Sequence, residues 1–253
     1  MSEHDHASAK GRPSAEDQGT AAGLDPLARE LSELAQTLQS QDDTQEVLDA
    51  IVGAAVNLIP GVDEGSISVV LNRRDVGSHS PSGELPRVVD GIQAEVGEGP
   101  CLDAAFEQQT VRVPDMAAEE RWPRFGRRAA EAGAKSMLAF QLFVEGDNLG
   151  ALNLYSYRPN AFDDESEHVG LLFASHAAVA FAGAQKMDQL KAAIDHRDLI
   201  GQAKGILMER YKLTADKAFL PLAGVSQRTN RKLYDLAEEL TSTGVLSEER
   251  RQT

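Results

Sequence analysis

The sequence predicts an α+β sandwich, a mainly antiparallel sheet flanked by helices, followed by a small all-helical domain of three helices. Four runs with strand signals lie between residues 65 and 157 and are separated by turns or helical stretches, which is typical of this class. Beyond them the spacing is helical, and no proline occurs from Glu165 to Tyr211. We therefore expect one long helix shared by a first domain at 25–187 and a second at 188–246.

The N-terminal residues predict a tail and two helices. Residues 1–24 are rich in Ser, Ala, Gly, Asp and Glu without an apolar period, so we expect them, like 247–253, to form tails. Asp25 as N-cap and Pro26 at the first position begin a helix with apolar residues at helical spacing, namely Leu27, Leu31, Leu34 and Leu38. Thr44 is a candidate N-cap for a second helix, ended by Pro60-Gly61, with apolar residues Val47, Leu48, Ile51, Ala55 and Leu58.

The sandwich follows in alternating strands and helices. In 65–71 the apolar residues Ile67, Val69 and Leu71 alternate with Ser66, Ser68 and Val70, which predicts a half-buried strand. A helix carries Leu85, Val88, Val89 and Ile92, and the loop 96–101 leads into a short helix. A strand at 111–114 and a helix at 121–133 come next. Strands Ser136–Val144 and Leu149–Tyr157, joined by turn residues 145–148, predict a hairpin.

The long helix carries a possible dimer seam. Apolar and small residues follow an alternating spacing of four and three, the pattern of a parallel coiled coil: Val169, Phe173, His176, Ala180, Gly183, Met187, Leu190 and Ile194. We expect a homodimer through Phe173, Ala180, Met187, Leu190 and Ile194. The alternative is that the first half of this seam packs onto its own sheet.

Charge is unevenly distributed along the chain. The formal net charge of −15 argues against indiscriminate nucleic-acid binding, because phosphate contacts need local positive charge. From Asp188 onward, however, 11 Lys and Arg stand against 10 Asp and Glu, whereas the preceding residues carry 14 against 30. This asymmetry hints at an acidic body that carries a nucleic-acid module.

Composition also excludes several classes of protein. A single cysteine, Cys101, excludes an intramolecular disulfide framework and a multi-cysteine zinc site. The sequence has no apolar run near the roughly 18 residues of a membrane helix, and its N-terminus lacks the apolar core of a signal peptide. We therefore expect a soluble, cytoplasmic protein. The histidines are scattered, so the spacing predicts no metal site and no catalytic constellation, and we expect no enzyme.

Two segments resemble known families. GEGPCLDAAFEQQTVRVPD at 97–115 and SMLAFQLFVEGDNLGALNLYSY at 136–157 resemble a GAF domain, closest to the actinobacterial subtype that precedes an ANTAR domain. DHRDLIGQAKGILMERYKLTADKAF and SQRTNRKLYDLAEEL, within 195–240, resemble the ANTAR domain of antitermination regulators. The resemblance implies a sensor domain that controls binding to paired hairpin loops in nascent RNA, which prevents a terminator from forming.

The expected RNA-binding residues follow from this resemblance and from their charge or shape. They are Arg197, Lys204, Tyr211, Gln227, Arg228, Asn230, Arg231 and Lys232. Ser226 is a candidate N-cap of a final helix with inner residues Leu233, Leu236, Ala237 and Leu240 and an end at Gly244, so the last five RNA-binding residues open that helix. Tyr211 is placed on one helix face with Ile200, Ala203 and Leu207, either to stack on a base or to fill the core. We expect Gly201 and Gly205 to let neighbouring helices pack closely against this one. Without the family resemblance, three short helices with basic ends would fit DNA as well as RNA.

The middle helix of this domain departs from the family pattern. Thr214 is its candidate N-cap, but Pro221 follows six residues after Ala215, and Ala223 stands where the family usually has arginine. We expect the helix to stop near Leu220 or to kink there. Weaker RNA affinity than in typical relatives would follow.

Two functions therefore stay open. The first is an RNA-binding antiterminator with a small apolar or mixed ligand in its GAF domain; the second is a signalling sensor or scaffold acting through protein contacts. GAF domains that reduce methionine sulfoxide use further cysteines, which this chain lacks. We expect no cofactor, although Cys101 leaves attachment of a haem or bilin open. Its position at the start of a helix allows a lowered thiol pKa, and the alternative is a buried structural cysteine.

Overall fold

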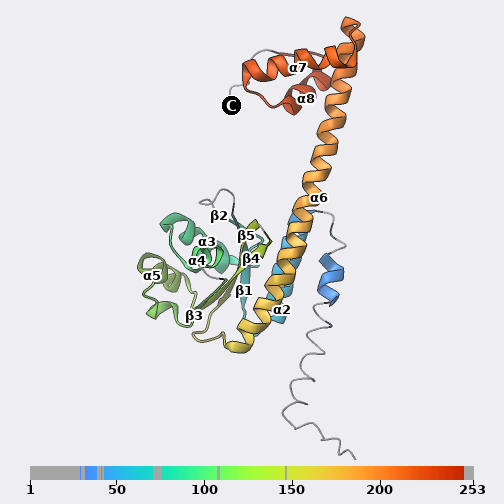
Figure 1. Ribbon diagram of the computed structural model, residues 1–253. Coiled ribbons are helices and arrows are strands. Elements are labelled where there is room, and N and C mark those ends of the chain that lie inside the picture. The colour runs from blue at the N-terminus through green and yellow to red at the C-terminus, as the bar shows by residue number, and fades with distance from the viewer. Residues whose placement is uncertain are drawn as a thin grey trace, which may run out of the picture. The chain divides into compact units, whose positions relative to one another are not determined.

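The computed structural model describes residues 29, 32–38, 41, 43–70, 76–106, 109–145 and 147–247. The chain separates into two compact units, Met1–Ala184 and Gln185–Thr253. The long helix α6, Asp164–Tyr211, belongs to both units, as its lack of proline predicts (Figure 1). Each unit is described by itself.

The first unit is built on a five-stranded sheet in which every neighbouring pair is antiparallel. Its strand order is β2-β1-β5-β4-β3. The strands are β1 Glu64–Val70, β2 Val76–His79, β3 Thr110–Val113, β4 Ser136–Val144 and β5 Asp147–Ser156. The β4–β5 hairpin confirms the prediction, with Leu138 opposite Leu154 at its centre. β2 is an edge strand of four residues that the sequence did not reveal.

Helices cover both faces of this sheet (Figure 1). On one face α2, Thr44–Leu58, and the first turns of α6 enclose a core that includes Ile51, Leu152 and Phe173. On the other face lies a second core. It is enclosed by α3 Glu84–Val96, α4 Pro100–Phe106, the 3-10 turn Met116–Ala118 and α5 Pro123–Ala132. The predicted α+β sandwich is confirmed.

Burial on both faces corrects the prediction of a half-buried first strand. Ser66 and Ser68 are as buried as Ile67, because α3 covers the side that the alternation assigned to solvent. The N-cap of α2 is Asp43 and not Thr44. The Asp43 carboxylate accepts hydrogen bonds from the backbone N–H groups of Gln45 and Glu46.

Two expectations near the N-terminus are tested only in part. In the segment 32–38, Leu34 and Leu38 are buried in the core that α2 helps to enclose, as the leucine spacing indicates. The predicted first helix also depends on Asp25, Pro26, Leu27 and Leu31, which lie outside the described residues. Leu71 of the predicted first strand lies outside them as well.

The second unit packs the last part of α6 against α7, Ala215–Thr229, and α8, Leu233–Thr243. Its core consists of Ala203, Leu207, Ala218, Leu222, Val225, Leu236, Ala237 and Leu240. Thr214 occupies the N-cap position of α7, and Gly244 ends α8 in the left-handed region with a φ of 74°. The predicted three-helix arrangement is confirmed.

Three details of this unit differ from expectation, and a fourth, the exposure of Tyr211, decides between two alternatives. α7 continues through Pro221 to Thr229, so it does not stop near Leu220. Ser226 lies inside α7 and its hydroxyl donates to the carbonyl of Arg231, 2.7 Å away, so it does not cap α8. Tyr211 is 60% exposed and does not belong to the core. Gly201 and Gly205 are exposed, and apart from the backbone of α6 itself no described atom lies within 4 Å of where a Cβ would lie, so no neighbouring helix in the described part of the chain packs closely on them.

Over the described part of the chain, every helix is too short or too polar to cross a membrane.

Candidate functional site

A groove lies in the second unit between the end of α6, α7 and the segment after α8. Its volume is ≈ 640 Å³. Tyr211, Leu220, Pro221 and Val245 contribute to a mainly apolar lining. Arg210 and Arg228 also line it, and among the described lining residues there is no carboxylate. The groove therefore combines an apolar floor with positive charge.

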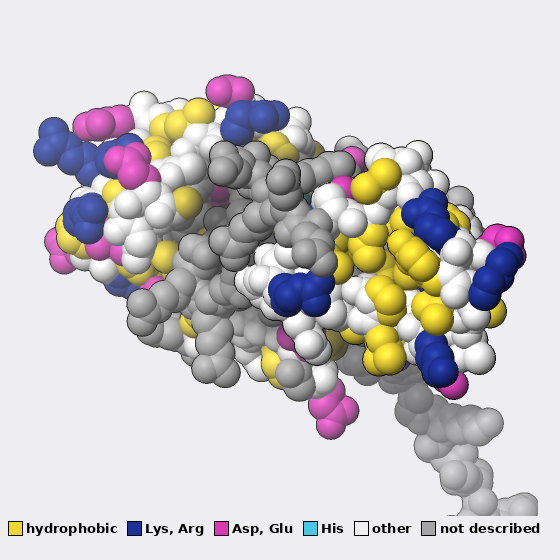
Figure 2. All heavy atoms as spheres, turned by 90° about the horizontal axis from the view of Figure 1, so that it is seen from above, with side chains coloured by type: hydrophobic (Ala, Val, Ile, Leu, Met, Phe, Trp, Pro, Cys, Tyr) yellow, Lys and Arg dark blue, Asp and Glu magenta, His cyan; other side chains and the backbone are white. Residues whose placement is uncertain are grey.

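The apolar lining of this groove is unusually open to solvent. Tyr211, Leu220 and Val245 are 60%, 66% and 59% exposed, far more than core residues. Figure 2, which looks down on α7 and the end of α6, shows hydrophobic side chains gathered together with Lys and Arg side chains around them. One guanidinium nitrogen of Arg210 donates to the carbonyl of Gly244 at 2.7 Å, which holds this cation beside the segment after α8.

The expected RNA-binding residues fall into three groups, which are those in the groove or at the end of α7 and its connection to α8, two that lie farther back on α6, and Arg231. Tyr211 and Arg228 both line the groove. Gln227 lies beside Arg228 in the last turn of α7, and Asn230, at φ 53°, and Lys232 lie in the exposed connection to α8. Arg197 and Lys204 do not reach the groove. They lie on α6 fourteen and seven residues before Tyr211, or roughly 21 and 10 Å along the helix at about 1.5 Å per residue.

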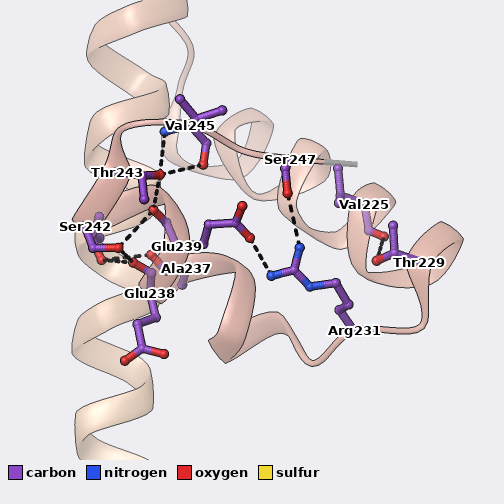
Figure 3. Close-up of polar contacts among 11 residues, drawn as sticks. Val225, Thr229, Arg231, Ala237, Glu238, Glu239, Ser242, Thr243, Val245 and Ser247 are labelled. Carbon is purple, nitrogen blue, oxygen red and sulfur yellow. Dashed lines mark hydrogen bonds and ion pairs between the residues drawn. The ribbon is translucent and has the colours of Figure 1, made fainter. Parts of the chain in front are cut away.

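The third group is Arg231 alone, which is directed into the unit (Figure 3). Its guanidinium forms an ion pair with the carboxylate of Glu239 on α8, and the two side chains are only 11% and 12% exposed. A second guanidinium nitrogen donates to the Ser247 hydroxyl at 3.4 Å. In this arrangement Arg231 links the α7–α8 connection to α8 and presents little surface to a ligand.

A buried polar cluster lies in the first unit, centred on Asp90 of α3. The carboxylate accepts hydrogen bonds from the hydroxyls of Ser66 and Ser78, each at 2.6 Å, from the Tyr155 hydroxyl, and from the Asn153 amide at 3.4 Å. All four donors are neutral. Burial raises the pKa of the Asp90 carboxyl and raises that of Tyr155 well above its ordinary value.

Beside this cluster is a cavity of ≈ 10 Å³, enough for about one water molecule. Ser68, Ser78, Asp90, Gln93 and Cys101 contribute to its lining. Among the described residues, the Gln93 Nε2 and Asn153 Oδ1 atoms are buried without a hydrogen-bond partner. This cluster is not predicted by the sequence, because an acidic residue in an amphipathic helix is typical of a solvent-exposed face.

Cys101 adjoins the cluster and is 1% exposed. Its backbone N–H donates to the Gln93 Oε1 at 2.9 Å. Burial, together with the nearby Asp90 carboxylate, raises the pKa of the thiol to about 12, opposite to the lowered pKa that its place at the start of a helix allows. The structure supports the alternative of a buried cysteine. Nowhere in the described segments do three or more His, Cys, Asp or Glu gather so that they could hold a metal ion.

This environment predicts an unreactive thiol. The thiolate is the nucleophile, and with a pKa of about 12 its fraction at pH 8 is on the order of 1,000-fold below that of an unfolded cysteine. Alkylation by iodoacetamide, followed by mass spectrometry, should be slower by about that factor in native protein than in urea. Comparable rates in both states would contradict the buried position of Cys101.

Comparisons with known proteins agree with this fold. The GAF domain family model matches residues 41–182, and the ANTAR domain model matches residues 188–240. No curated protein sequence matches the chain.

Solved structures resemble the first unit in fold alone. The GAF domain of an Acinetobacter phosphoenolpyruvate-protein phosphotransferase is 16% identical with a TM-score of 0.50, over 64% of this chain and 97% of that one. The free methionine-R-sulfoxide reductase of Neisseria meningitidis is 19% identical with a TM-score of 0.51, over 63% and 90%. The chromophore-binding domain of a bacteriophytochrome from R. palustris is 9% identical with a TM-score of 0.50, over 65% and 63%. Because the GAF match spans more than half of its length, the chain belongs to the GAF domain family, and an ANTAR domain follows at residues 188–240.

Proposed function

We propose that the protein is a transcription antitermination regulator whose ANTAR domain binds hairpin-loop RNA under control of its GAF domain. The observation that carries this proposal is the groove in which the exposed Tyr211 lies with Arg210 and Arg228. Both matched families are regulatory domains, and we propose that the chain acts without catalysis. Action on nascent transcripts would place it in the cytoplasm.

The groove offers the two kinds of contact that an RNA loop needs. An unpaired base can stack on an aromatic ring, and the apolar floor at Leu220 and Pro221 would shield the base from water. The guanidinium groups of Arg210 and Arg228 suit the flanking phosphates. Gln227, Asn230 and Lys232, exposed at the end of α7 and in its connection to α8, add amides and a cation for base edges and backbone.

The competing function is a sensor or scaffold that acts through protein contacts. The same groove favours it to a degree, because exposed apolar residues such as Leu220 and Val245 also suit a protein partner. The two guanidinium groups that line the groove, those of Arg210 and Arg228, favour a polyanion. RNA is therefore the occupant that we propose.

The first test is RNA binding by variants of Tyr211. The probe is an RNA with two GC-rich stems and unpaired loops. We expect Tyr211→Ala to weaken its binding by about 5- to 150-fold, which corresponds to the loss of roughly 1–3 kcal/mol for one base stack. Tyr211→Phe keeps the ring and should bind as the wild type does. Arg228→Gln should lower affinity and reduce the salt dependence by about one unit of slope. Gel-shift titrations at several salt concentrations measure all three.

Two outcomes would contradict this interpretation. Equal affinity of the wild type for random duplex DNA and for hairpin RNA would remove the proposed selectivity. If the RNA binds but Tyr211→Ala binds it equally well, the groove is not the contact surface.

We further propose that the GAF domain holds a small ligand with polar groups at the Asp90 cluster. The unpartnered atoms of Gln93 and Asn153, one a donor and one an acceptor, support a ligand with polar groups over a purely apolar one, the two kinds that the sequence left open. The present cavity admits about one water, so a larger ligand requires the cluster to open. The alkylation assay on Cys101 reports such opening when it is repeated with candidate ligands.

A further inference from the structure

The cavity beside the Asp90 cluster lies close to the surface of the first unit. Its lining combines buried residues, among them Asp90 and Gln93, with Ser78 on β2 and Ala94 on α3, which are exposed. The Ser78 hydroxyl donates to the Asp90 carboxylate at 2.6 Å, so the buried acid is one hydrogen bond away from a surface residue. The approach from solvent to Asp90 is therefore short and passes between β2 and α3.

The charge of Asp90 is buried among uncharged partners. The groups that donate to its carboxylate are the hydroxyls of Ser66, Ser78 and Tyr155 and the amide of Asn153. By contrast, the equally secluded carboxylate of Glu239 in the second unit is paired with the guanidinium of Arg231. Neutral donors solvate a carboxylate without cancelling its charge, and burial raises the pKa of Asp90. A cation beside Asp90 would stabilise the ionised form, so this carboxylate is a suitable counter-ion for a cationic group.

Gln93 adds a second requirement on the ligand. Its Oε1 accepts a hydrogen bond from the backbone N–H of Cys101 at 2.9 Å, which fixes the orientation of the side-chain amide. The Nε2 donor of this cavity-lining residue is therefore the atom that stays buried without an acceptor among the described residues, and such a donor is unfavourable. In the same cluster, Asn153 keeps an acceptor, Oδ1, without a donor. A ligand that satisfies both atoms carries an oxygen acceptor as well as N–H or O–H donors.

We propose that the ligand of the GAF domain is a small primary amine in its ammonium form, with Asp90 as its counter-ion and an oxygen acceptor close to the amine for Gln93. This inference rests on the ligand site proposed above and names the chemical class of its ligand. The cavity of ≈ 10 Å³ admits a group of about the size of one water molecule, which suits an ammonium group with its three N–H donors. The remaining atoms of the ligand require the cluster to open toward Ser78 and Ala94. A quaternary amine is excluded from this class because it has no N–H donor for Asp90 or Asn153.

Two small amides test the charge of the ligand. Glycinamide carries an ammonium group beside a carbonyl oxygen, and glycolamide has nearly the same shape with a neutral hydroxyl in place of the ammonium group. At pH 7 an α-amino group, with a pKa of about 7.7–8.0, is largely protonated. We expect the full chain to bind glycinamide at least about tenfold more tightly than glycolamide in isothermal titration calorimetry, because only glycinamide brings a cation to Asp90.

The variant Asp90→Asn tests the position of the site. Asparagine keeps an oxygen that can accept from the serine hydroxyls but removes the charge, so glycinamide should bind at least about tenfold more weakly and lose its advantage over glycolamide. Asp49→Asn is the matched control, because Asp49 is exposed on α2, on the other face of the sheet, and the change in charge is the same. Circular dichroism checks that both variants fold. If Asp90→Asn does not fold, the comparison of the two amides on the wild type still decides.

The outcomes separate this inference from the functions on which it rests. Equal affinity of the wild type for both amides would overturn the cationic class and leave a ligand site at the cluster. Binding of glycinamide that Asp90→Asn leaves unchanged would overturn it as well, since the amine would then bind elsewhere. If neither amide binds at millimolar concentrations, the inference fails, and a single buried water is the better occupant for Gln93 and Asn153. RNA binding by the ANTAR domain is measured separately by gel shift and stands or falls independently of these results.

Discussion

Replacing Arg231 with Ala is expected to destabilise the ANTAR domain by about 3–5 kcal/mol, as is typical when one partner of a buried ion pair is removed. The carboxylate of Glu239 would then lie without its cation at a site where it is only 12% exposed. The α7–α8 connection would also lose its link to Ser247. Urea unfolding of the full chain, followed by circular dichroism, measures the loss.

The matched control is Lys232→Ala, because Lys232 is the neighbouring cation and is exposed. It should change the free energy of unfolding by no more than about 0.5 kcal/mol. Replacing both partners, Arg231→Met with Glu239→Leu, should recover most of the stability, since no charge is left buried. If Arg231→Ala unfolds like the wild type and instead loses only RNA affinity, the guanidinium leaves Glu239 in solution and serves as an RNA contact.

The placement of Arg231 shows what a single sequence does not contain. Ser226 precedes a run of polar residues, which is a good N-cap signal, and this placed the start of the last helix several residues too early. The structure uses the Ser226 hydroxyl as a donor to the Arg231 carbonyl instead. The ion pair joins residues eight apart across a helix start, a contact that depends on tertiary geometry and leaves no periodic trace.

Regular elements were more predictable than sites. The hairpin of β4 and β5 and the long α6 were predicted correctly because apolar alternation, turn residues and the absence of proline act locally. Burial of Ser66 and Ser68 was not, since it depends on which helix covers the second face of the sheet. The Asp90 cluster joins four elements whose polar residues each look like ordinary surface positions. Phe173 and Ala180 pack in or against the core beside the sheet, which is the alternative that the sequence left open for the first half of the coiled-coil seam.

Pro221 gives the second large effect that we expect. α7 runs without interruption from Ala215 to Thr229, yet Pro221 has no N–H for the carbonyl of Lys217 and its ring crowds that carbonyl. The domain thus carries a cost of about 3 kcal/mol that its core must offset. Pro221→Ala restores the hydrogen bond and removes the crowding, so we expect the ANTAR domain to gain up to about that amount. Thermal unfolding should shift upward by roughly 4–8 °C per kcal/mol gained.

The double variant Pro221→Leu with Ala223→Arg distinguishes RNA binding from protein contacts as the function of the domain. Leucine relieves the helix and keeps an apolar side chain at the groove, while arginine restores the cation that ANTAR domains usually carry there. We expect a higher melting temperature and tighter binding of the double-hairpin RNA. A lower melting temperature would mean that packing of the proline ring stabilises the domain by more than the proline costs inside the helix. A higher melting temperature without a gain in affinity would favour protein contacts, because a better-formed helix with an added cation would then still fail to attract RNA.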